Sequence, residues 1–553
     1  MSSWVLPLGL FVFLEAFLGF WGVNIEDGGL ILAQSRRILF GEVPHVDFIT
    51  PRPTGSAFLH LLDFALPIPL ILASKIVTLA EFVAIGVFFS LFVYRKRLGD
   101  LSFPEAVGVV VAVLVGIHQF PIIPFYTIDG LALVGAAFLL LQRGVHSRRL
   151  AHIAPAFGLL GVAATTKQSF WFAPFFAFAW LVASFHRQHA PPRQLARAAL
   201  AAVGACAAAP AAYVAYVAIG GGWAEMRAEL TQTTPVWGDI LLSQLRNPDL
   251  RSHLLPSLLV LMVAAALVQL APVRLPAAID VGARVVATIA VLHLITEERL
   301  GFNGNWSQRL FWCVVAVAII RSIAQRRLDV VGLAVAFTAW MTTLSWGAPT
   351  PALSAGACAV YLAEAIWRGV PPPPHAQRWL LPAGAVVAGL IVAVTSVHVR
   401  TRDDYGVLRG TESWTLGGAL QGVRMDQTTA TYLSDVRSCV AMHPARWTAV
   451  VPEGALAYAV YGLRNPFPID WFWPPDYTGA GGRQRLIDAA STLDRRGNYL
   501  VLFQTASFGM PVKPGQIDSF VSDPPLASEL ASRLRHARRT DCHSFVAFYD
   551  PST

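Results

Sequence analysis

The sequence predicts an α-helical polytopic membrane protein with a C-terminal α/β domain, and three observations lead to that fold class. Apolar residue types make up 55% of the 553 residues and charged types only 14%, against roughly 25% charged in soluble domains. Apolar runs of membrane-spanning length recur as far as residue 397. Charges, turn residues and short mixed runs dominate after that point. This composition excludes a soluble multidomain enzyme and a disordered chain.

The apolar runs number about thirteen, since a bilayer core of ~30 Å takes about 20 apolar residues per helix. They lie near 4–23, 67–93, 104–123, 129–142, 152–166, 169–185, 197–219, 254–271, 281–296, 309–323, 328–346, 350–367 and 379–397. The first run lacks the basic start and small-residue cleavage site of a signal peptide, so we expect it to span the membrane. Runs 152–166 and 169–185 are alternatively one broken helix.

The basic residues set the orientation of these runs. Every second connection is basic and carries members of the set Arg95, Lys96, Arg97, Arg143, Arg148, Arg149, Arg187, Arg193, Arg197, Arg274, Arg284, Arg321, Arg326, Arg327, Arg368 and Arg378. Lys and Arg accumulate in cytoplasmic loops. We therefore expect a multi-pass protein of the inner (cytoplasmic) membrane with a cytoplasmic N-terminus. Two outward segments, 24–66 and 220–253, are too long for simple turns.

Two domains follow from this map, a transmembrane domain over 1–397 and an extracytoplasmic α/β domain over 398–553. In the second, helix-like stretches near 425–441, 483–495 and 524–538 each precede a strand-like stretch, at 447–451, 499–503 and 544–549, which is typical of an α/β fold. Cys206, Cys313 and Cys358 fall in membrane runs. Cys439 and Cys542 fall in the outer domain, where an oxidising environment favours a disulfide over two unpaired thiols.

The first outward segment carries the acids that point to chemistry. Glu26 and Asp27 stand at the outer end of the first run, where partial desolvation can tune a carboxylate as a base. Residues 30–40 have helical apolar spacing with Arg36 and Arg37 between, which predicts an amphipathic helix lying on the membrane surface. Its arginines are expected to meet lipid phosphates.

The pattern of this segment resembles a known superfamily. Its residues are Asp27, Arg36, Arg37, Gly41, Pro44, Asp47, Phe48 and the Pro-rich turn Pro51-Arg52-Pro53. It is similar to the first outer loop of the GT-C superfamily, integral-membrane glycosyltransferases that use polyprenyl-phosphate sugars. The most similar branch contains protein O-mannosyltransferases and lipid A aminoarabinose transferases. That branch often has an acid at the outer start of the fourth span and a Lys-Gln pair between spans five and six, positions held here by Asp129 and by Lys167 and Gln168.

The resemblance implies an inverting transfer of a single sugar from a polyprenyl-phosphate donor to an acceptor hydroxyl on a glycan, lipid or protein. Asp27 is then the expected base and Asp129 a second acid. Residues 26 and 27 are Glu-Asp here, whereas mannosyltransferases have Asp-Glu. Glu26 is therefore an alternative candidate for the base. Lys167 is the expected ligand of the donor phosphate, and Arg309, at the outer start of the tenth run, is a second candidate for that role. Asp47, Arg52 and Gln168 are candidate supporting residues, and membrane lipids are expected partners.

Other interpretations of the same residues stay open. Glu26, Asp27, Asp47 and Asp129 are also suited to capping helices, and Asp47 alternatively bridges to Arg52. Lys167 and Arg309 are also placed to snorkel. The aromatic set Trp471, Trp473 and Tyr477 suits stacking on acceptor sugars, resting on the membrane interface or plugging a local core. Several ionisable residues within or near apolar runs are interpreted as satisfied core polar groups, namely Glu15, Glu81, His118, His293 and Glu364.

The alternative function is a non-enzymatic lipid-linked glycan transporter or flippase with an outer sensor domain. Transporters carry charged groups near the midplane in both halves, whereas the acids and Lys167 gather here at outer helix ends. No basic–aromatic pattern indicates nucleic acid. No metal motif is strong enough to predict ligands, so no cofactor is predicted and a divalent ion (Mg²⁺, Mn²⁺ or Ca²⁺) stays open.

Overall fold

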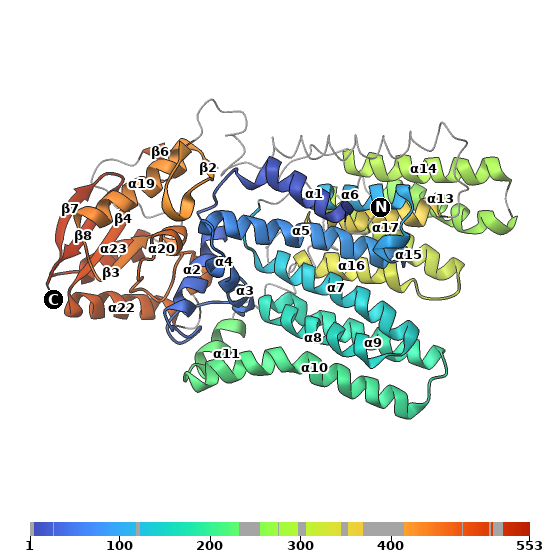
Figure 1. Ribbon diagram of the computed structural model, residues 1–553, viewed down its shortest axis with the longest axis horizontal. Helices are drawn as coiled ribbons and strands as arrows, with labels where there is room; N and C mark the ends of the chain where they lie inside the picture. The colour runs from blue at the N-terminus through green and yellow to red at the C-terminus, as the bar shows by residue number, and fades with distance from the viewer. Residues whose placement is uncertain are drawn as a thin grey trace.

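The protein is elongated, with long helices at one end and a sheet domain at the other (Figure 1). The computed structural model describes residues 5–25, 27–117, 122–231, 255–274, 276–296, 306–343, 352–368, 414–477, 479, 481–507, 510–511 and 524–552. Three short helices, α2 (Asp27–Leu39), α3 (Gly55–Leu59) and α4 (Leu61–Ala65), lie between the two ends. The predicted domain boundary at residue 398 lies outside the described residues.

The helical part follows the predicted apolar runs. Its elements are α1 (Val5–Leu14), η1 (Glu15–Gly19), α5 (Leu70–Tyr94), η2 (Leu98–Asp100), α6 (Phe103–Ile117), α7 (Tyr126–Ser147), α8 (Leu150–Thr166), η3 (Gln168–Phe172), α9 (Ala173–Arg187), α10 (Pro192–Ile219), α11 (Trp223–Thr231), α13 (Leu255–Arg274), α14 (Ala277–Thr296), α15 (Trp306–Ala324), α16 (Val330–Thr343), η5 (Ala352–Ser354) and α17 (Ala355–Trp367). Each predicted run before residue 368 coincides with a helix. The run 379–397 lies outside the described residues.

In the described part of the chain, fewer helices than predicted meet both the length and the composition expected of a membrane span. Among the described residues, four helices are long and apolar enough to cross a membrane: Leu70–Tyr94, Tyr126–Ser147, Gln168–Arg187 and Pro192–Ile219. Several others, such as Phe103–Ile117 and Leu150–Thr166, are apolar but shorter. The structure therefore supports a helical membrane protein without supporting a count of thirteen spans.

The alternative of one broken helix over 152–185 is wrong. Helices α8 and α9 are separate elements joined by Lys167 and the 3₁₀ turn η3. Helix α8 also packs closely on α10. A Cβ at Gly161 would come within 2.2 Å of the Cys206 carbonyl oxygen, so glycine is needed there for the two backbones to approach.

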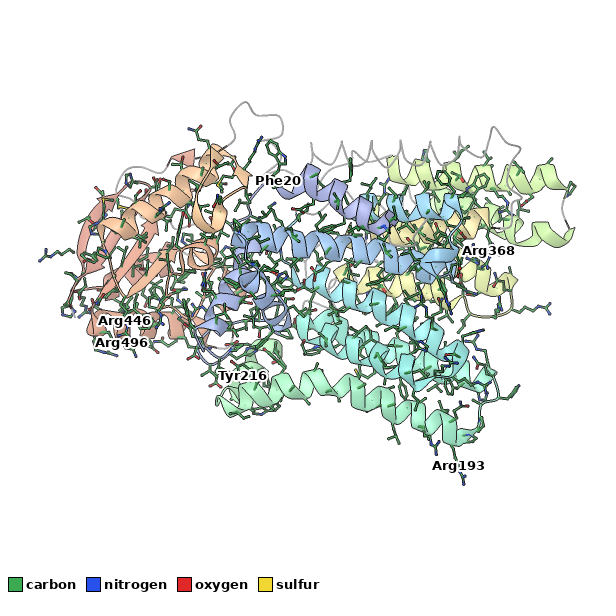
Figure 2. All side chains as sticks on the ribbon, viewed as in Figure 1. Phe20, Arg193, Tyr216, Arg368, Arg446 and Arg496 are labelled. Carbon is green, nitrogen blue, oxygen red and sulfur yellow. A yellow bond between two sulfur atoms is a disulfide. The ribbon has the colours of Figure 1, made fainter. Side chains whose placement is uncertain are left out.

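The two ends of the helices differ in charge. Arg193 and Arg368 lie at the end away from the sheet domain (Figure 2). At that end Arg321 pairs with Asp329 at 3.4 Å and with Glu364 at 3.1 Å, joining α15, the start of α16 and α17. The opposite end meets α2, α3 and α4. Arg193, Arg321 and Arg368 of the predicted basic set thus lie away from the sheet domain.

The C-terminal domain, residues 414–552, is built on a four-stranded sheet of order β3-β4-β8-β7. Its strands are β3 (Trp447–Val451), β4 (Tyr499–Gln504), β7 (Arg538–Cys542) and β8 (Phe545–Asp550), with β3 parallel to β4 and the other pairs antiparallel. The remaining elements are β1 (Trp414–Thr415), η7 (Gly418–Leu420), β2 (Arg424–Met425), α19 (Gln427–Met442), α20 (Ala455–Tyr461), α21 (Pro474–Tyr477), α22 (Gly482–Arg496), β5 (Ala506–Ser507), β6 (Met510–Pro511) and α23 (Pro524–Arg533). The predicted helix–strand pairs are confirmed, whereas α20 and β7 were not predicted.

The central strand β4 is buried along its whole length because helices cover both faces of the sheet. Its Leu500 and Leu502 belong to the core under α19 and α20, while Tyr499, Val501 and Phe503 belong to the core under α22. The first of these cores also includes apolar residues of α2 and the start of α5. The C-terminal domain is therefore packed onto the helical part through a shared core.

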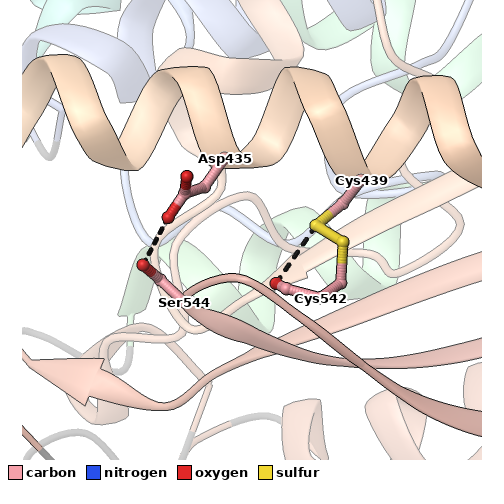
Figure 3. Close-up of a disulfide and its surroundings, with 4 residues drawn as sticks. All are labelled: Asp435, Cys439, Cys542 and Ser544. Carbon is pink, nitrogen blue, oxygen red and sulfur yellow. Dashed lines mark hydrogen bonds between the residues drawn. A yellow bond between two sulfur atoms is a disulfide. The ribbon is translucent and has the colours of Figure 1, made fainter.

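A disulfide joins Cys439 of α19 to Cys542 at the end of β7, with their Cα atoms 5.9 Å apart (Figure 3). Beside it the Ser544 hydroxyl donates to the Asp435 carboxylate. The two links fasten α19 across the edge of the sheet.

Helix α2 lies inside the molecule rather than on a membrane surface. Residues 28–35 and Arg37 are buried, and a Cβ at Gly29 would come within 2.5 Å of the Leu456 backbone nitrogen in α20. Arg36 donates to the Ala459 carbonyl oxygen at 2.8 Å. The Nε of Arg37 donates to both carboxylate oxygens of Asp470, at 2.9 and 3.0 Å.

The prediction that Arg36 and Arg37 meet lipid phosphates is therefore wrong. An amphipathic helix with interspersed arginines suits a lipid surface and a protein surface equally well. Here the partner surface is the C-terminal domain, which is more than 400 residues away in the sequence. Local periodicity does not distinguish the two cases.

Candidate functional site

The first loop, α11 and the C-terminal domain are joined through the carboxylate of Glu229 on α11. One of its oxygens lies 2.7 Å from His45 Nδ1 and accepts from the Thr50 backbone N–H at 3.0 Å. The other accepts from Arg485 of α22 at 2.7 Å. The Ile49 N–H also donates to the Pro468 carbonyl oxygen at 2.7 Å. These bonds fix the loop after α2 against the C-terminal domain.

A mixed-charge group, here named the junction cluster, lies where these parts meet. It consists of Asp27 at the start of α2, Arg52 in the Pro-rich turn, Tyr126 at the start of α7 and Asp476 in α21. The Arg52 guanidinium lies 4.7 Å from the centre of the Tyr126 ring and 4.0 Å from the Asp476 carboxylate. Arg52, Tyr126 and Asp476 line a small cavity together with Leu30, Gln34, Thr54 and Asp470, among others. Both the helical part and the C-terminal domain contribute to it.

The charges of the junction cluster act on one another. Burial by itself lowers the pKa of Arg52, but the acidic groups of Tyr126, Asp476 and Asp27 raise it above its ordinary value. Burial raises the pKa of Asp476, and the charge of Arg52 partly offsets that effect. Arg52 is thus a permanent cation held among acids, with its side chain 24% exposed. Such a guanidinium is suited to an anionic ligand entering from the cavity.

Lys167 and Gln168 lie behind this cluster. The Lys167 side chain is fully buried, and its ammonium donates to the Thr127 hydroxyl at 2.8 Å and to the Thr342 carbonyl oxygen at 3.3 Å. Burial and, after it, the charge of Arg52 lower the pKa of Lys167 well below its ordinary value. The Gln168 side-chain amide donates to the Pro51 carbonyl oxygen. Gln168 therefore holds the turn that presents Arg52, whereas the site of Lys167 disfavours a positive charge on its side chain.

A second group, here named the inter-helix cluster, contains Asp129. It consists of His60 between α3 and α4, Asp63 in α4, Glu81 in α5 and Asp129 in the first turn of α7. His60 Nδ1 lies 2.8 Å from Asp63 Oδ2, and His60 Nε2 lies 3.3 Å from Asp129 Oδ1. His60, Asp63 and Asp129 are each 1% exposed. Burial opposes the charged form of His60, but Asp129 and Asp63 raise its pKa well above the ordinary value.

The first turn of α7 contacts the junction cluster, the Lys167 side chain and the inter-helix cluster. Tyr126 stacks under Arg52, Thr127 accepts from Lys167, and Asp129 faces His60. Successive side chains of a helix point in different directions around its axis, so one turn can serve three neighbours. The predicted catalytic acids Asp27 and Asp129 consequently lie in different clusters.

The remaining predicted residues are dispersed. Asp47 is exposed and accepts from the Val43 N–H at 2.6 Å, while the acid nearest Arg52 among the ion pairs of the described residues is Asp476. Arg309 is buried in the first turn of α15. Glu26 lies outside the described residues.

The aromatic residues of the C-terminal domain divide into two environments. The rings of Trp471 and Trp473 stack, with centroids 5.3 Å apart, and both side chains are partly buried. Tyr477 is 1% exposed and belongs to the core under α22. Only the two tryptophans therefore present part of their rings to the surroundings.

Sequence reasoning missed His60, Asp63, Tyr126 and Asp476, and it assigned Glu81 to the core. Glu81 Oε2 has no hydrogen-bond partner among the described residues, so the interpretation of Glu81 as a satisfied polar group is wrong. An ionisable group within an apolar run was the available signal. Asp476 gave no signal, because the fold alone brings it to Arg52.

The fold and the two clusters define a helical membrane protein whose polar site lies where its helices meet an α/β domain. No protein-family model matches this chain, and no curated protein matches it. One similar solved structure is the apo form of the oligosaccharyltransferase of Archaeoglobus fulgidus. The similarity covers 91% of this chain and 69% of that chain, with 12% sequence identity and a TM-score of 0.44. A likeness at this level assigns neither an activity nor a residue.

Proposed function

We propose that the chain is an inverting glycosyltransferase that moves a single sugar from a polyprenyl-phosphate donor to an acceptor hydroxyl. The proposed site faces the outer side of the cytoplasmic membrane, with the basic helix ends inside. The junction cluster is the observation that supports this function. In this cluster the carboxylate of Asp27 acts electrostatically on Arg52, a partly exposed cation that lines a cavity between the helices and the C-terminal domain.

The proposed step is a direct displacement. The acceptor oxygen forms a bond to the anomeric carbon as the bond from that carbon to the phosphate oxygen breaks. Asp27 takes the hydroxyl proton, and the leaving lipid phosphate keeps the electron pair. Arg52 donates to the departing phosphate, whose growing negative charge it stabilises. Because no covalent sugar–enzyme intermediate forms, the configuration at the anomeric carbon inverts.

The residues predicted around this step take modified roles in the proposal. Lys167 holds the first turn of α7 through Thr127 instead of binding the phosphate directly, since its side-chain nitrogen already contacts Thr127 and Thr342. Arg309 stays a proposed second cation for the donor. The stacked Trp471 and Trp473 are proposed to receive a sugar ring of the acceptor.

The test is a transfer assay on the purified full chain in lipid nanodiscs. It uses a panel of radiolabelled polyprenyl-phosphate sugars with membrane acceptors and compares wild type with Asp27→Asn. Loss of the general base is expected to lower the transfer rate by about 10²–10⁴-fold. The matched control is Asp100→Asn, an exposed acid in η2 between α5 and α6, which should transfer as wild type does.

Two results contradict the proposal. Equal rates for wild type and Asp27→Asn would remove Asp27 as the base. Absence of transfer from every donor in the panel would favour the transporter with an outer sensor domain.

A further inference from the structure

The inter-helix cluster takes no part in the transfer step proposed above, yet it concentrates three carboxylates around one imidazole. One ligand atom from each of His60, Glu81 and Asp129 lies within 4.8 Å of the others. These residues come from three separate elements, the α3–α4 turn, α5 and α7. The cluster is therefore a product of tertiary packing rather than of one local motif.

The carboxylates of this cluster are short of hydrogen-bond donors. Among the described residues, no donor reaches Asp63 Oδ1, Glu81 Oε2 or Asp129 Oδ2. Asp63 and Asp129 are almost wholly buried. A buried carboxylate without a donor or a counter-ion is strongly disfavoured. The cluster is therefore completed either by a bound cation or by protons shared between the acids.

We propose that His60, Glu81 and Asp129 bind one divalent transition-metal ion of the Zn²⁺ or Mn²⁺ kind. An imidazole nitrogen beside carboxylate oxygens suits such ions, whereas Mg²⁺ and Ca²⁺ prefer oxygen ligands alone. With bonds of about 2.0–2.2 Å, three equally spaced ligand atoms of one ion lie at most about 3.8 Å from one another. A contraction of the cluster by about 1 Å therefore satisfies this limit.

Asp63 is a positioning residue in this proposal. Its carboxylate lies 2.8 Å from His60 Nδ1 and would keep a proton on that nitrogen, so that Nε2, 3.3 Å from Asp129, is the nitrogen left to bind the ion. A carboxylate behind a ligating histidine fixes the tautomer and the ring orientation. The ion would tie α5 and the α3–α4 turn to the first turn of α7, the turn that carries Tyr126 into the junction cluster.

The experiment measures metal binding directly. Full-length protein in nanodiscs is stripped with a chelator and titrated separately with Zn²⁺, Mn²⁺ and Mg²⁺, using calorimetry and elemental analysis. We expect about one Zn²⁺ or Mn²⁺ per chain and a higher melting temperature with the ion than without it. Glu81→Gln and Asp129→Asn should lose stoichiometric binding, and Asp63→Asn should weaken the affinity by about 10–100-fold.

The matched control is Glu15→Gln, a partly buried carboxyl of η1 outside the cluster, which should bind the ion as wild type does. If a ligand variant fails to fold, Asp63→Asn still tests the site, because it keeps all three ligands. No stoichiometric binding of Zn²⁺ or Mn²⁺ by the stripped wild type would overturn the proposal. Unchanged affinity for the ion in both Asp63→Asn and Glu81→Gln would also overturn the proposal. The cluster would then be a network of carboxyl groups that share protons. Metal content is read independently of sugar transfer, so failure of one proposal leaves the other standing.

Discussion

The junction cluster and the inter-helix cluster share the first turn of α7, through Tyr126 and Asp129 respectively, yet they differ in charge balance and accessibility. In the first, Arg52 stands among acids and its side chain is partly exposed. In the second, His60 faces three carboxyl groups, and Asp63 and Asp129 are almost inaccessible. The first is built from both domains, whereas the second is built within the helical part alone.

This contrast separates two uses of acidic residues at the outer ends of helices. A cluster with its own cation and a cavity can exchange charged ligands, because its charges stay compensated when the ligand leaves. A buried cluster with excess carboxylate has to keep its counter-ion or its protons. We therefore propose that the junction cluster exchanges substrate and that the inter-helix cluster retains an ion.

The largest expected effect comes from breaking the docking of the two domains with Asp470→Asn. Asp470 pairs with Arg37, and the two side chains are only 2% and 6% exposed. Loss of one partner of a buried ion pair costs roughly 3–5 kcal/mol. Melting and limited proteolysis should show a loosened C-terminal domain, and transfer should fall while the metal content of the inter-helix cluster is kept.

The control for this change is Asp488→Asn, which alters an exposed acid of α22 that accepts from Gln484 at 2.8 Å. It should leave melting and transfer as in wild type. A parallel loss of bound metal in Asp470→Asn would show that the two clusters are not independent. That outcome would contradict the distinction between an exchanging junction cluster and an ion-retaining inter-helix cluster.

The next effect is confined to the junction cluster and comes from Arg52→Gln. Removing a donor that stabilises transition-state charge typically lowers a rate by about 10²–10³-fold. Arg52→Lys should fall between this variant and wild type, because an ammonium keeps the charge but lacks the planar fork. The measurements are the transfer rate and the metal content, which should stay at the wild-type value in both variants.

Arg193→Gln serves as the control for Arg52, since Arg193 is exposed at the far end of the helices (Figure 2). A transfer rate in Arg52→Gln within a few-fold of wild type, while Arg193→Gln also stays unchanged, would argue against a phosphate role for Arg52.

The elements of the fold were largely predictable, because their signals are local. Apolar runs predicted the helices up to residue 368, and strand-like stretches such as 447–451 predicted the strands. The number of membrane-spanning helices was not predictable in this way. The ends of an apolar run are uncertain in the sequence, so a run too short to cross the bilayer cannot be distinguished from one that is long enough. The position of α2 was missed because its partners, Ala459 and Asp470, are remote in sequence.

The site was predictable only where a motif is continuous. Asp129 was predicted at the outer start of the fourth span, and the helical turn that carries it does reach both clusters. The sequence did not predict that Asp27 and Asp129 lie in different clusters, because this depends on the direction in which each side chain points from its helix. Asp476 and Asp63 meet their partners through packing between elements, which spacing along the chain does not encode.

The smallest expected effect comes from changing Asp494, a carboxylate of the C-terminal domain that, unlike those of the inter-helix cluster, is satisfied by hydrogen-bond donors. Asp494 accepts from the Tyr499 hydroxyl at 2.7 Å, the His536 N–H at 2.9 Å and His536 Nδ1 at 2.8 Å. Burial would raise the pKa of Asp494, but these hydrogen bonds and the charge of His536 lower it below its ordinary value. Unlike Asp129, this carboxylate needs no further cation.

Because the pKa of Asp494 is lower in the folded protein, its stabilising contribution is present above its ordinary pKa of about 3.9 and is lost as the pH falls through the folded value. Asp494→Asn should therefore lower the stability of the C-terminal domain near neutral pH by about 0.5–1.5 kcal/mol. The gap from wild type should close below about pH 4, as followed by melting between neutral and acidic pH. Transfer and metal content should stay unchanged, because donors rather than an ion satisfy this acid. A gap that stayed constant down to low pH would show that the hydrogen bonds to Asp494 do not depend on its charge.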